Sequence, residues 1–192
     1  MQKNKFITTA LSIVLMQETE VKILEVNRQK IEENLINLGA KKIFDGDIQT
    51  FFFDFADAKI VKAKDVLRLR KEGDMSELTY KKVRFTDDVK NAQEYTVSIS
   101  NLETMKLILE YLGLNVTECM EKHRVSYTLE TARFDIDRYF GNYAYIPEFM
   151  EIEAKNPEQI HKYANLLGFE AKDCLPWSTQ DLINHYSRSP AK

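Results

Sequence analysis

The stretch EKHRVSYTLETARFDIDR, residues 121–138, decides how the chain is interpreted. Side chains of a β-strand alternate between its two faces, so Lys122 and Arg124 share one face, opposite a histidine and a valine. After a short connection, Asp135 and Asp137 alternate with apolar residues in the same way. The stretch therefore predicts two strands, each with one charged face and one largely apolar face.

The same alternation recurs along the whole chain. Strands are predicted at Glu18–Val26, Asp45–Asp54, Val66–Arg70, Leu78–Val83, Glu94–Ile99, Glu121–Leu129, Arg133–Arg138 and Phe149–Glu153. Amphipathic helices are predicted at Arg28–Leu38, at Leu102–Leu112, from Asn156 to the glycine at 168, and after Ser178. Since no Pro/Ser-rich linker divides these elements, we expect one α+β domain, a large antiparallel sheet with helices packed on it.

The charged faces carry paired like charges. The cations are Lys22, Arg68, Arg70, Lys81, Lys122 and Arg124, and the carboxylates are Glu18, Glu20, Asp135, Asp137, Glu151 and Glu153. A solvated sheet face explains any single strand. Like charges side by side repel, however, unless a group of opposite sign lies between them. The repeated pattern therefore predicts a closed β-barrel that is polar inside, holds a polyanion and metal ions, and is wrapped by the helices.

Composition narrows the classes of protein. The chain has 192 residues, which fits one domain, and its net charge of -3 argues against a general nucleic-acid coat. Its two cysteines form no motif and indicate reduced thiols in a cytoplasmic protein, and its three scattered histidines argue against structural zinc. An apolar run at 6–15 is too short for a membrane span. We interpret residues 1–15 as a flexible extension, with Met16 as an alternative start, and residues 16–192 as the domain.

The sequence offers no glycine-rich phosphate loop, because none of its six glycines belongs to one. Phosphate must therefore be bound by side chains, and the forked donors of arginine suit this task. Paired carboxylates favour Mg²⁺ or Mn²⁺ over zinc.

In their order along the chain, these motifs resemble the CYTH superfamily, the triphosphate tunnel metalloenzymes. The motifs are ExExK (18–22), a helix ending in LGA (38–40), RLR (68–70), LTYKK (78–82), EKHR (121–124), a later Asp and EIE (151–153). The similarity extends from about Met16 to Tyr186. The superfamily includes class IV adenylyl cyclases, thiamine triphosphatases and inorganic triphosphatases.

The resemblance implies an eight-stranded antiparallel tunnel and assigns roles to its charged residues. It implies that Lys22, Arg68, Arg70, Lys81, Lys122 and Arg124 bind the triphosphate. It implies that Glu18, Glu20, Asp137, Glu151 and Glu153 hold Mg²⁺ or Mn²⁺, and that Glu18, Glu20, Lys22 and Glu153 are catalytic. The family pattern has one aspartate where this chain has two, and we match it to Asp137. Gln49, and the residues Gln93, Thr96 and Ser98, stand where the family often has acids, which puts a second metal in doubt.

Three functions are compatible with this pattern. The first is hydrolysis of inorganic triphosphate or of an organic triphosphate such as ATP or thiamine triphosphate. The second is an adenylyl cyclase that makes cyclic AMP and pyrophosphate, with a purine pocket lined by Tyr139, Phe140, Tyr143 and Tyr145; a packed loop is the competing interpretation of these residues. The third is a non-catalytic module that binds polyphosphate or a nucleotide. We favour the triphosphatase. We expect the protein to bind a small molecule that contains a triphosphate and to bind neither a membrane nor nucleic acid. A homodimer is left open.

Overall fold

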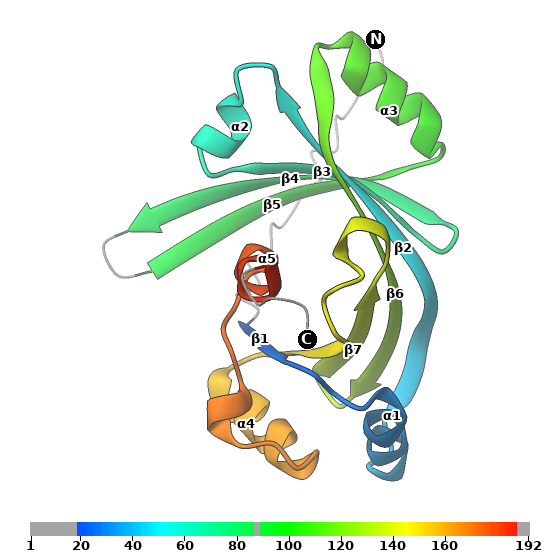
Figure 1. Cartoon of the computed structure of the whole chain (residues 1–192), viewed down its shortest axis with the longest axis vertical. Helices are drawn as coiled ribbons and strands as arrows, with labels where there is room; N and C mark the ends of the chain where they lie inside the picture. Colours follow the sequence, from blue (N-terminus) through cyan, green and yellow to red (C-terminus); the bar gives the residue numbers. More distant parts are fainter. Residues whose placement is uncertain (1–18, 87–88, 188–192) are drawn as a thin grey trace, which may run out of the picture.

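The computed structural model describes residues 19–86 and 89–187, in which eight strands form one antiparallel sheet (Figure 1). The predicted extension at 1–15 and Glu18 lie outside the described residues. The strands are β1 (Thr19–Ile23), β2 (Lys41–Phe55), β3 (Val66–Glu72), β4 (Met75–Thr86), β5 (Val89–Ile99), β6 (Leu114–Leu129), β7 (Ala132–Tyr139) and β8 (Phe149–Ala154). Their order is β1-β8-β7-β6-β2-β3-β4-β5. The prediction of an eight-stranded antiparallel sheet with flanking helices is confirmed.

The helices begin and end close to the predicted residues. They are α1 (Arg28–Asn37), α2 (Lys59–Lys62), α3 (Leu102–Tyr111), α4 (Pro157–Leu166) and α5 (Thr179–Ser187), with short 3₁₀ turns η1 (Gly141–Tyr143) and η2 (Ala171–Asp173). Asn27, Asn101 and Asn156 cap α1, α3 and α4 through their side chains. The short helix α2 was not predicted. It is held by the buried carboxylate of Asp54, which accepts hydrogen bonds from the backbone of Ile60 and Val61 at 2.9 Å.

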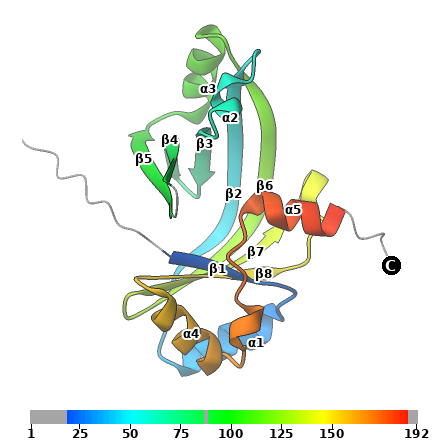
Figure 2. The same ribbon diagram turned by 90° about the vertical axis from the view of Figure 1, so that its left-hand side faces the viewer.

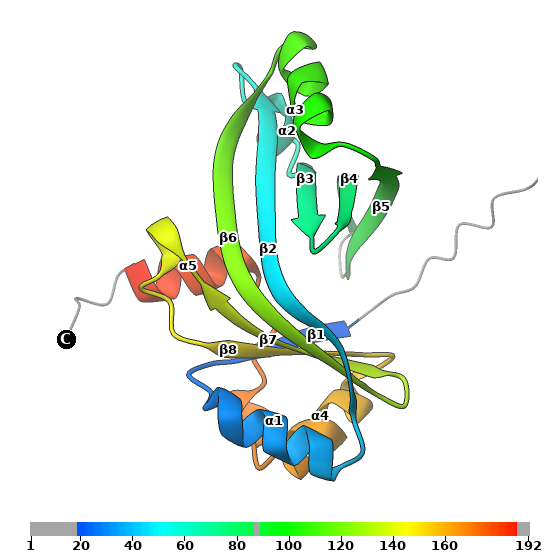
Figure 3. The same cartoon turned by 90° about the vertical axis from the view of Figure 1, so that its right-hand side faces the viewer.

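The long strands β2 and β6 join two groups of elements. Figure 3 shows β3, β4, β5, α2 and α3 at one end of this ribbon, and β1, β7, β8, α1 and α4 at the other. Register shifts interrupt the pairing of β2 with β6 at Lys42/Phe44 and Phe52/Phe53. Bulges of this kind bend a strand and increase its twist, so the sheet curves and its polar face becomes concave.

The apolar faces of the strands form two clusters under the helices. In the first, Val125, Phe134 and Ile152 pack against Leu35 of α1 and Tyr163 of α4. The second contains Phe51, Phe53, Leu67 and Leu69 of β2 and β3 together with Ile60 of α2 and Leu109 of α3. Because successive side chains alternate, this burial directs the charged residues to the opposite, concave face.

Helix α5 belongs to the polar face. Its Leu182 is fully buried in a third cluster with Met120, Tyr139 and Phe149. Tyr139 and Asp137 lie two residues apart on β7, so they share a face. Helix α5 therefore covers one end of the concave surface, beside β7 and β8 (Figure 2).

The predicted closure of the barrel is not confirmed, since the sheet order ends at β1 and β5 and no pairing joins these two strands in the described residues. The free edge of β1 is partly occupied by another segment. The backbone of Lys22 donates a hydrogen bond to Leu175 at 2.8 Å and accepts one from it at 2.9 Å. The chain leading into α5 thus takes the edge positions that a closing strand would need.

Measured against the length and hydropathy that a bilayer-spanning helix requires, every helix within residues 19–86 and 89–187 falls short.

Candidate triphosphate site

Arg124 is the centre of an ion-pair network on β6, β7 and β8. Its guanidinium donates to Asp137 at 2.5 and 2.6 Å, to Asp135 at 2.5 Å and to Glu151 at 2.5 Å. Lys122 donates to Oδ2 of Asp137 at 2.6 Å, an oxygen that also accepts from Arg124. Asp137 is fully buried, and Arg124 is 6% exposed. We call these five residues the β6–β8 wall.

The charged groups of the β6–β8 wall shift one another's pKa values. Although burial opposes it, Asp137 and Glu151 raise the pKa of Arg124 well above its ordinary value. Burial and the neighbouring Arg124 lower the pKa of Lys122, against the attraction of Asp137. Burial would raise the pKa of Glu151, but Lys122, Arg124 and Lys22 lower it strongly. Glu151 is therefore an ionised carboxylate that holds cations from two strands.

Lys22 on β1 joins this network from the other side of β8. Lys22 is 2% exposed, and its amine lies 2.9 Å from Glu151 and also pairs with Glu20. Burial lowers the pKa of Lys22, but Glu151 and Glu20 outweigh this and raise it. Glu20 lies opposite Glu153 in the register of β1 and β8, and Lys22 lies opposite Glu151. The predicted catalytic residues Glu20, Lys22 and Glu153 are thus adjacent on one face.

Arg68 and Arg70 on β3, which we call the β3 pair, are held far less tightly. Their contacts to Glu77 are 3.7 and 3.9 Å, and Arg70 lies 3.7 Å from Glu72. The Nε atoms of both arginines are buried and have no hydrogen-bond partner within the described residues. Burial, Arg68 and Arg124 lower the pKa of Arg70. A buried donor without an acceptor is costly, so the β3 pair has unused capacity to bind an anion.

The β3 pair faces the β6–β8 wall across the concave surface. Arg133 of β7 lies 3.8 Å from Glu72 of β3, although two strands, β6 and β2, separate them in the sheet. Arg124 of β6 is likewise close enough to Arg70 of β3 to lower its pKa. Curvature of the sheet therefore brings cations from β3 and β6 around one space.

Lys81 contributes from β4, where it donates to Glu94 of β5 at 2.7 Å. Burial would raise the pKa of Glu94, but Lys81, Arg68 and Arg70 lower it. Next to this pair, Thr79 and Thr96 share a hydrogen bond at 3.0 Å. Glu94 is thus a carboxylate of β5 that lies close to Lys81 and to the β3 pair.

The carboxylates fit a divalent metal only in part. No group of three or more His, Cys, Asp or Glu within the described residues is arranged around a metal position. Asp137 and Glu151 already accept from cations at 2.5–2.9 Å. Glu20, which also pairs with Lys22, and Glu153 supply oxygen donors at opposed positions of β1 and β8, and oxygen donors are what Mg²⁺ and Mn²⁺ prefer. These two residues would hold such a cation.

Two of the four aromatic residues that could form a purine pocket are packed, and two are exposed. Tyr139 is 5% exposed and stacks on Phe149 at 5.8 Å between ring centroids. Tyr143 contacts Tyr139 and donates to Glu118. Phe140 and Tyr145 are exposed. The packed-loop interpretation is confirmed for Tyr139 and Tyr143, which join the cluster under α5.

Sequence reasoning missed several residues of this face. Arg133, Glu72 and Glu77 were not singled out, nor was the position of α5 over the polar face. A signal existed for two of them, because Arg133 precedes Asp135 by two residues and Glu72 follows Arg70 by two. Residues two apart in a strand share a face.

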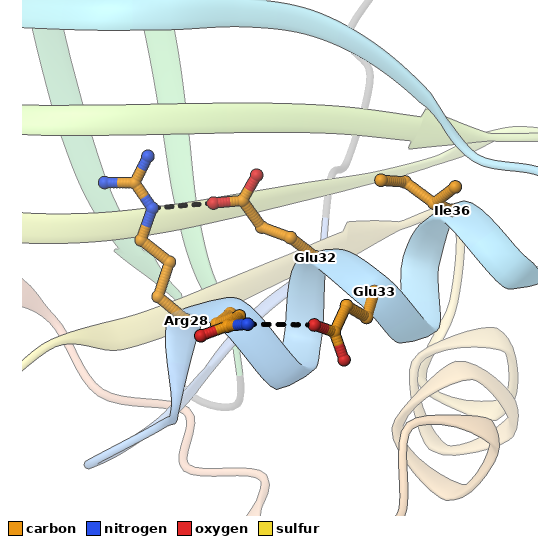
Figure 4. A pocket seen from close by; sticks show the side chains of 5 residues that line it. Arg28, Glu32, Glu33 and Ile36 are labelled. Atoms are coloured by element: carbon orange, nitrogen blue, oxygen red, sulfur yellow. Dashed lines mark hydrogen bonds and ion pairs between the residues drawn. The ribbon is translucent and has the colours of Figure 1, made fainter.

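Outside this face, Figure 4 shows a shallow pocket of about 390 Å³ on α1, lined by Arg28, Gln29, Glu32, Glu33 and Ile36. Its polar side chains pair along the helix, with Arg28 donating to Glu32 at 2.7 Å and Gln29 donating to Glu33 at 3.1 Å. Since α1 covers the apolar side of the sheet, this pocket is separate from the charged residues described above.

Comparison with known proteins gives a consistent result. A family model described as CYTH domain matches residues 16–173. A protein of Methanocaldococcus jannaschii, provisionally named adenylate cyclase, is 28% identical over 138 residues, 72% of this chain and 77% of that protein. A solved structure from Pyrococcus horikoshii has a TM-score of 0.67 at 25% identity, covering 86% of this chain and 98% of that one.

A Hippeastrum protein, provisionally named adenylyl cyclase and described as having a dominant triphosphatase activity, has a TM-score of 0.60. It is 15% identical, and the match covers 90% of this chain and 98% of that one. At this identity the likeness concerns the fold alone.

Proposed function

The chain belongs to the CYTH domain family, and from this premise we propose that it is a metal-dependent triphosphatase whose concave polar face binds the triphosphate. The observation that carries the proposal is the β3 pair, Arg68 and Arg70, whose buried Nε donors have no partner in the described residues. Phosphate oxygens are strong acceptors that match the guanidinium fork. An anion between β3 and β6 would accept hydrogen bonds from these donors. Its negative charge would also lie between Arg70 and Arg124, which repel each other.

The remaining cations would surround the same anion. Lys22, Lys122 and Arg124 are positioned by carboxylates before any ligand arrives. Such preorganised charge stabilises a phosphoryl group as negative charge shifts to the leaving oxygen. Lys81 would approach from β4, where Glu94 now holds it.

We assign the divalent cation to Glu20 and Glu153, with Glu18 as a further candidate that lies outside the described residues. When bound, the metal would supply charge neutralisation and activate the attacking water. Lys22, which pairs with Glu20 and Glu151, would orient these carboxylates and contact a phosphoryl oxygen.

The closed tunnel is part of this proposal. Burial lowers the pKa of Arg70, and so does repulsion by Arg68 on the same strand and by Arg124 across the concave face. A polyanion with several negative charges would replace that repulsion by attraction. We propose that ligand binding draws the β3–β5 group towards β1 and completes the enclosure without strand pairing at Lys22, where Leu175 occupies the edge of β1.

An adenylyl cyclase is the second candidate, favoured by the name of the Methanocaldococcus jannaschii relative. It needs room for a purine at one end of the site. Helix α5, with Leu182, Tyr139 and Tyr143, fills one end. The triphosphatase demands less space, and the described activity of the Hippeastrum protein is consistent with it. A non-catalytic polyphosphate-binding module is the third candidate.

The deciding experiment is product analysis. The purified protein is incubated with inorganic triphosphate, ATP or thiamine triphosphate, each with Mg²⁺ or Mn²⁺. We expect release of orthophosphate. Cyclic AMP with pyrophosphate from ATP would instead establish the cyclase, and binding without turnover would establish the binding module.

Metal-ligand variants sharpen this test. Glu20→Gln and Glu153→Gln each remove one negative ligand at nearly constant volume, so we expect turnover to fall on the order of a hundredfold or more while the fold is kept. Glu110→Gln, on the exposed side of α3, is the matched control. Wild-type turnover in both site variants at low Mg²⁺ would reject the metal assignment.

A further inference from the structure

Cations and carboxylates alternate in a continuous ladder from β6 to β3. Lys122 and Arg124 share Asp137, and Arg124 and Arg133 share Asp135. Arg133 donates to the two oxygens of Asp135 at 2.9 and 3.1 Å, and its other end lies 3.8 Å from Glu72 on β3. Arg133 thus continues the row of cations one step beyond those assigned to the triphosphate.

The position of Arg133 along β7 places it at the end of the site away from α5. Tyr139 packs beneath α5, while Asp137, Asp135 and Arg133 follow at two-residue intervals on the same face. At about 3.3 Å per residue, Arg133 lies roughly 20 Å along the strand from Tyr139. The end of the concave face next to Arg133 is therefore the one that α5 leaves uncovered.

Arg133 is less tightly held than Arg124. Its side chain is 38% exposed, against 7% for Arg124, and its contact with Glu72 is longer than a hydrogen bond. Arg133 also donates to Asp135 at 2.9 and 3.1 Å and to Ser126 at 3.3 Å, so its contact with Glu72 is the one that it can exchange for a ligand at small cost. Glu72, on the facing strand, competes with such a ligand for the same guanidinium.

We infer that Arg133 is a seventh anion-binding cation, which contacts the outermost phosphoryl group of the bound chain at the end away from α5, with Glu72 as its partner when no ligand is bound. The inference rests on the proposed triphosphate site and deepens it. In this arrangement the first two phosphoryl groups contact the β3 pair and Arg124, and the third contacts Arg133, whose guanidinium adjoins that of Arg124 at a shared Asp135 oxygen. Arg133 would then discriminate between ligands by their length.

The test is calorimetric titration of the full chain with inorganic pyrophosphate, triphosphate and tetraphosphate, in EDTA so that turnover does not change the ligand. For Arg133→Ala we expect the dissociation constants of triphosphate and tetraphosphate to rise about tenfold or more. That of pyrophosphate should stay within about twofold. Arg138→Ala is the matched control, since Arg138 lies on the same strand but on the opposite, exposed side.

Glu72→Gln separates ligand contact from a structural role. If Glu72 competes with the ligand, this variant should bind tetraphosphate more tightly than the wild type. A purely structural pair predicts weaker binding in both Arg133→Ala and Glu72→Gln, and that result would overturn the inference. Should Arg133→Ala fail to fold, Arg133→Lys and Glu72→Gln decide the matter.

The two proposals fail differently. A wild type that binds none of the three anions, either in EDTA or with Mg²⁺ present, contradicts the triphosphate site itself. A wild type that binds them, with equal constants in Arg133→Ala, contradicts the role of Arg133 alone.

Discussion

On the β6–β8 wall, Arg124 meets three carboxylates within 2.6 Å, whereas the carboxylates nearest to Arg68 and Arg70 on β3 lie 3.7–3.9 Å away. Both sets of cations come from the same sequence pattern of charged residues two apart. The difference lies in their neighbours, since β7 and β8 supply buried acids to β6, and β2 supplies none to β3. We therefore expect the β6–β8 wall to contribute mainly to folding stability and the β3 pair mainly to ligand binding.

The largest expected effect is on stability, from Arg124→Ala. Removing this guanidinium leaves Asp137 with Lys122, Asp135 with Arg133 and Glu151 with Lys22, so each buried carboxylate loses its shared partner. Breaking a buried ion-pair network in this way typically costs about 3–5 kcal/mol. We expect a loss of this size in the free energy of unfolding, measured by urea denaturation without ligand.

Arg138→Ala, an exposed arginine of β7, should change the free energy of unfolding by no more than about 0.5 kcal/mol. The double variant Arg124→Ala/Asp137→Ala should be less unstable than the sum of the two single changes. Equal, small effects of Arg124→Ala and Arg138→Ala on the free energy of unfolding would contradict the contrast between the β6–β8 wall and the β3 pair.

The second effect is on ligand binding, from Arg70→Ala. Without ligand, this change removes a cation that is repelled by Arg68 and Arg124, so the unliganded protein should lose little stability. With inorganic triphosphate and Mg²⁺, it should lose about 1.5–3 kcal/mol of ligand-induced stabilisation. Melting curves with and without ligand measure both quantities.

Lys71→Ala is the matched control for Arg70, because Lys71 is its neighbour on β3 but exposed on the other face. It should keep the full ligand-induced shift. If Arg70→Ala also keeps this shift, the β3 pair is not the anion site.

The smallest effect concerns acid pH. The pKa of Glu151 is lowered in the folded protein because Lys122, Arg124 and Lys22 outweigh the effect of burial. A carboxyl whose pKa is lower when folded adds stability above its unfolded value, here 4.5, and loses it as pH falls through the folded value. The free energy of unfolding should therefore decrease below pH 4.5.

Glu151→Gln should flatten this acid limb, whereas Arg70→Ala should retain it, because the β3 pair has no comparable acid. Urea denaturation at a series of pH values between 7 and 3 measures the slopes. An unchanged slope in Glu151→Gln would show that acids elsewhere, such as Asp54 or Glu32, dominate the acid response; their pKa values are also lowered.

Much of the fold could be predicted because its signals are local. The alternation in residues 121–138 predicted both strands and their charged faces, and the apolar periodicity of Arg28–Leu38 and Leu102–Leu112 predicted two of the helices. The short helix α2 could not be predicted, because its stability depends on the buried Asp54 carboxylate rather than on a hydrophobic period. Closure was predicted from the repeated charged strand faces, which favour a shared polar interior, but Leu175 pairs with the edge of β1 at Lys22.

The sequence alone determined which residues share a face, because the two-residue period of a strand is a property of the backbone. It thereby determined that six cations and a set of carboxylates line one side of the sheet. Only the tertiary structure decided which cations are neutralised, that Arg133 meets Glu72 across two intervening strands, and that α5 covers one end. Those contacts depend on strand order and sheet curvature, which arise from packing between segments far apart in the chain.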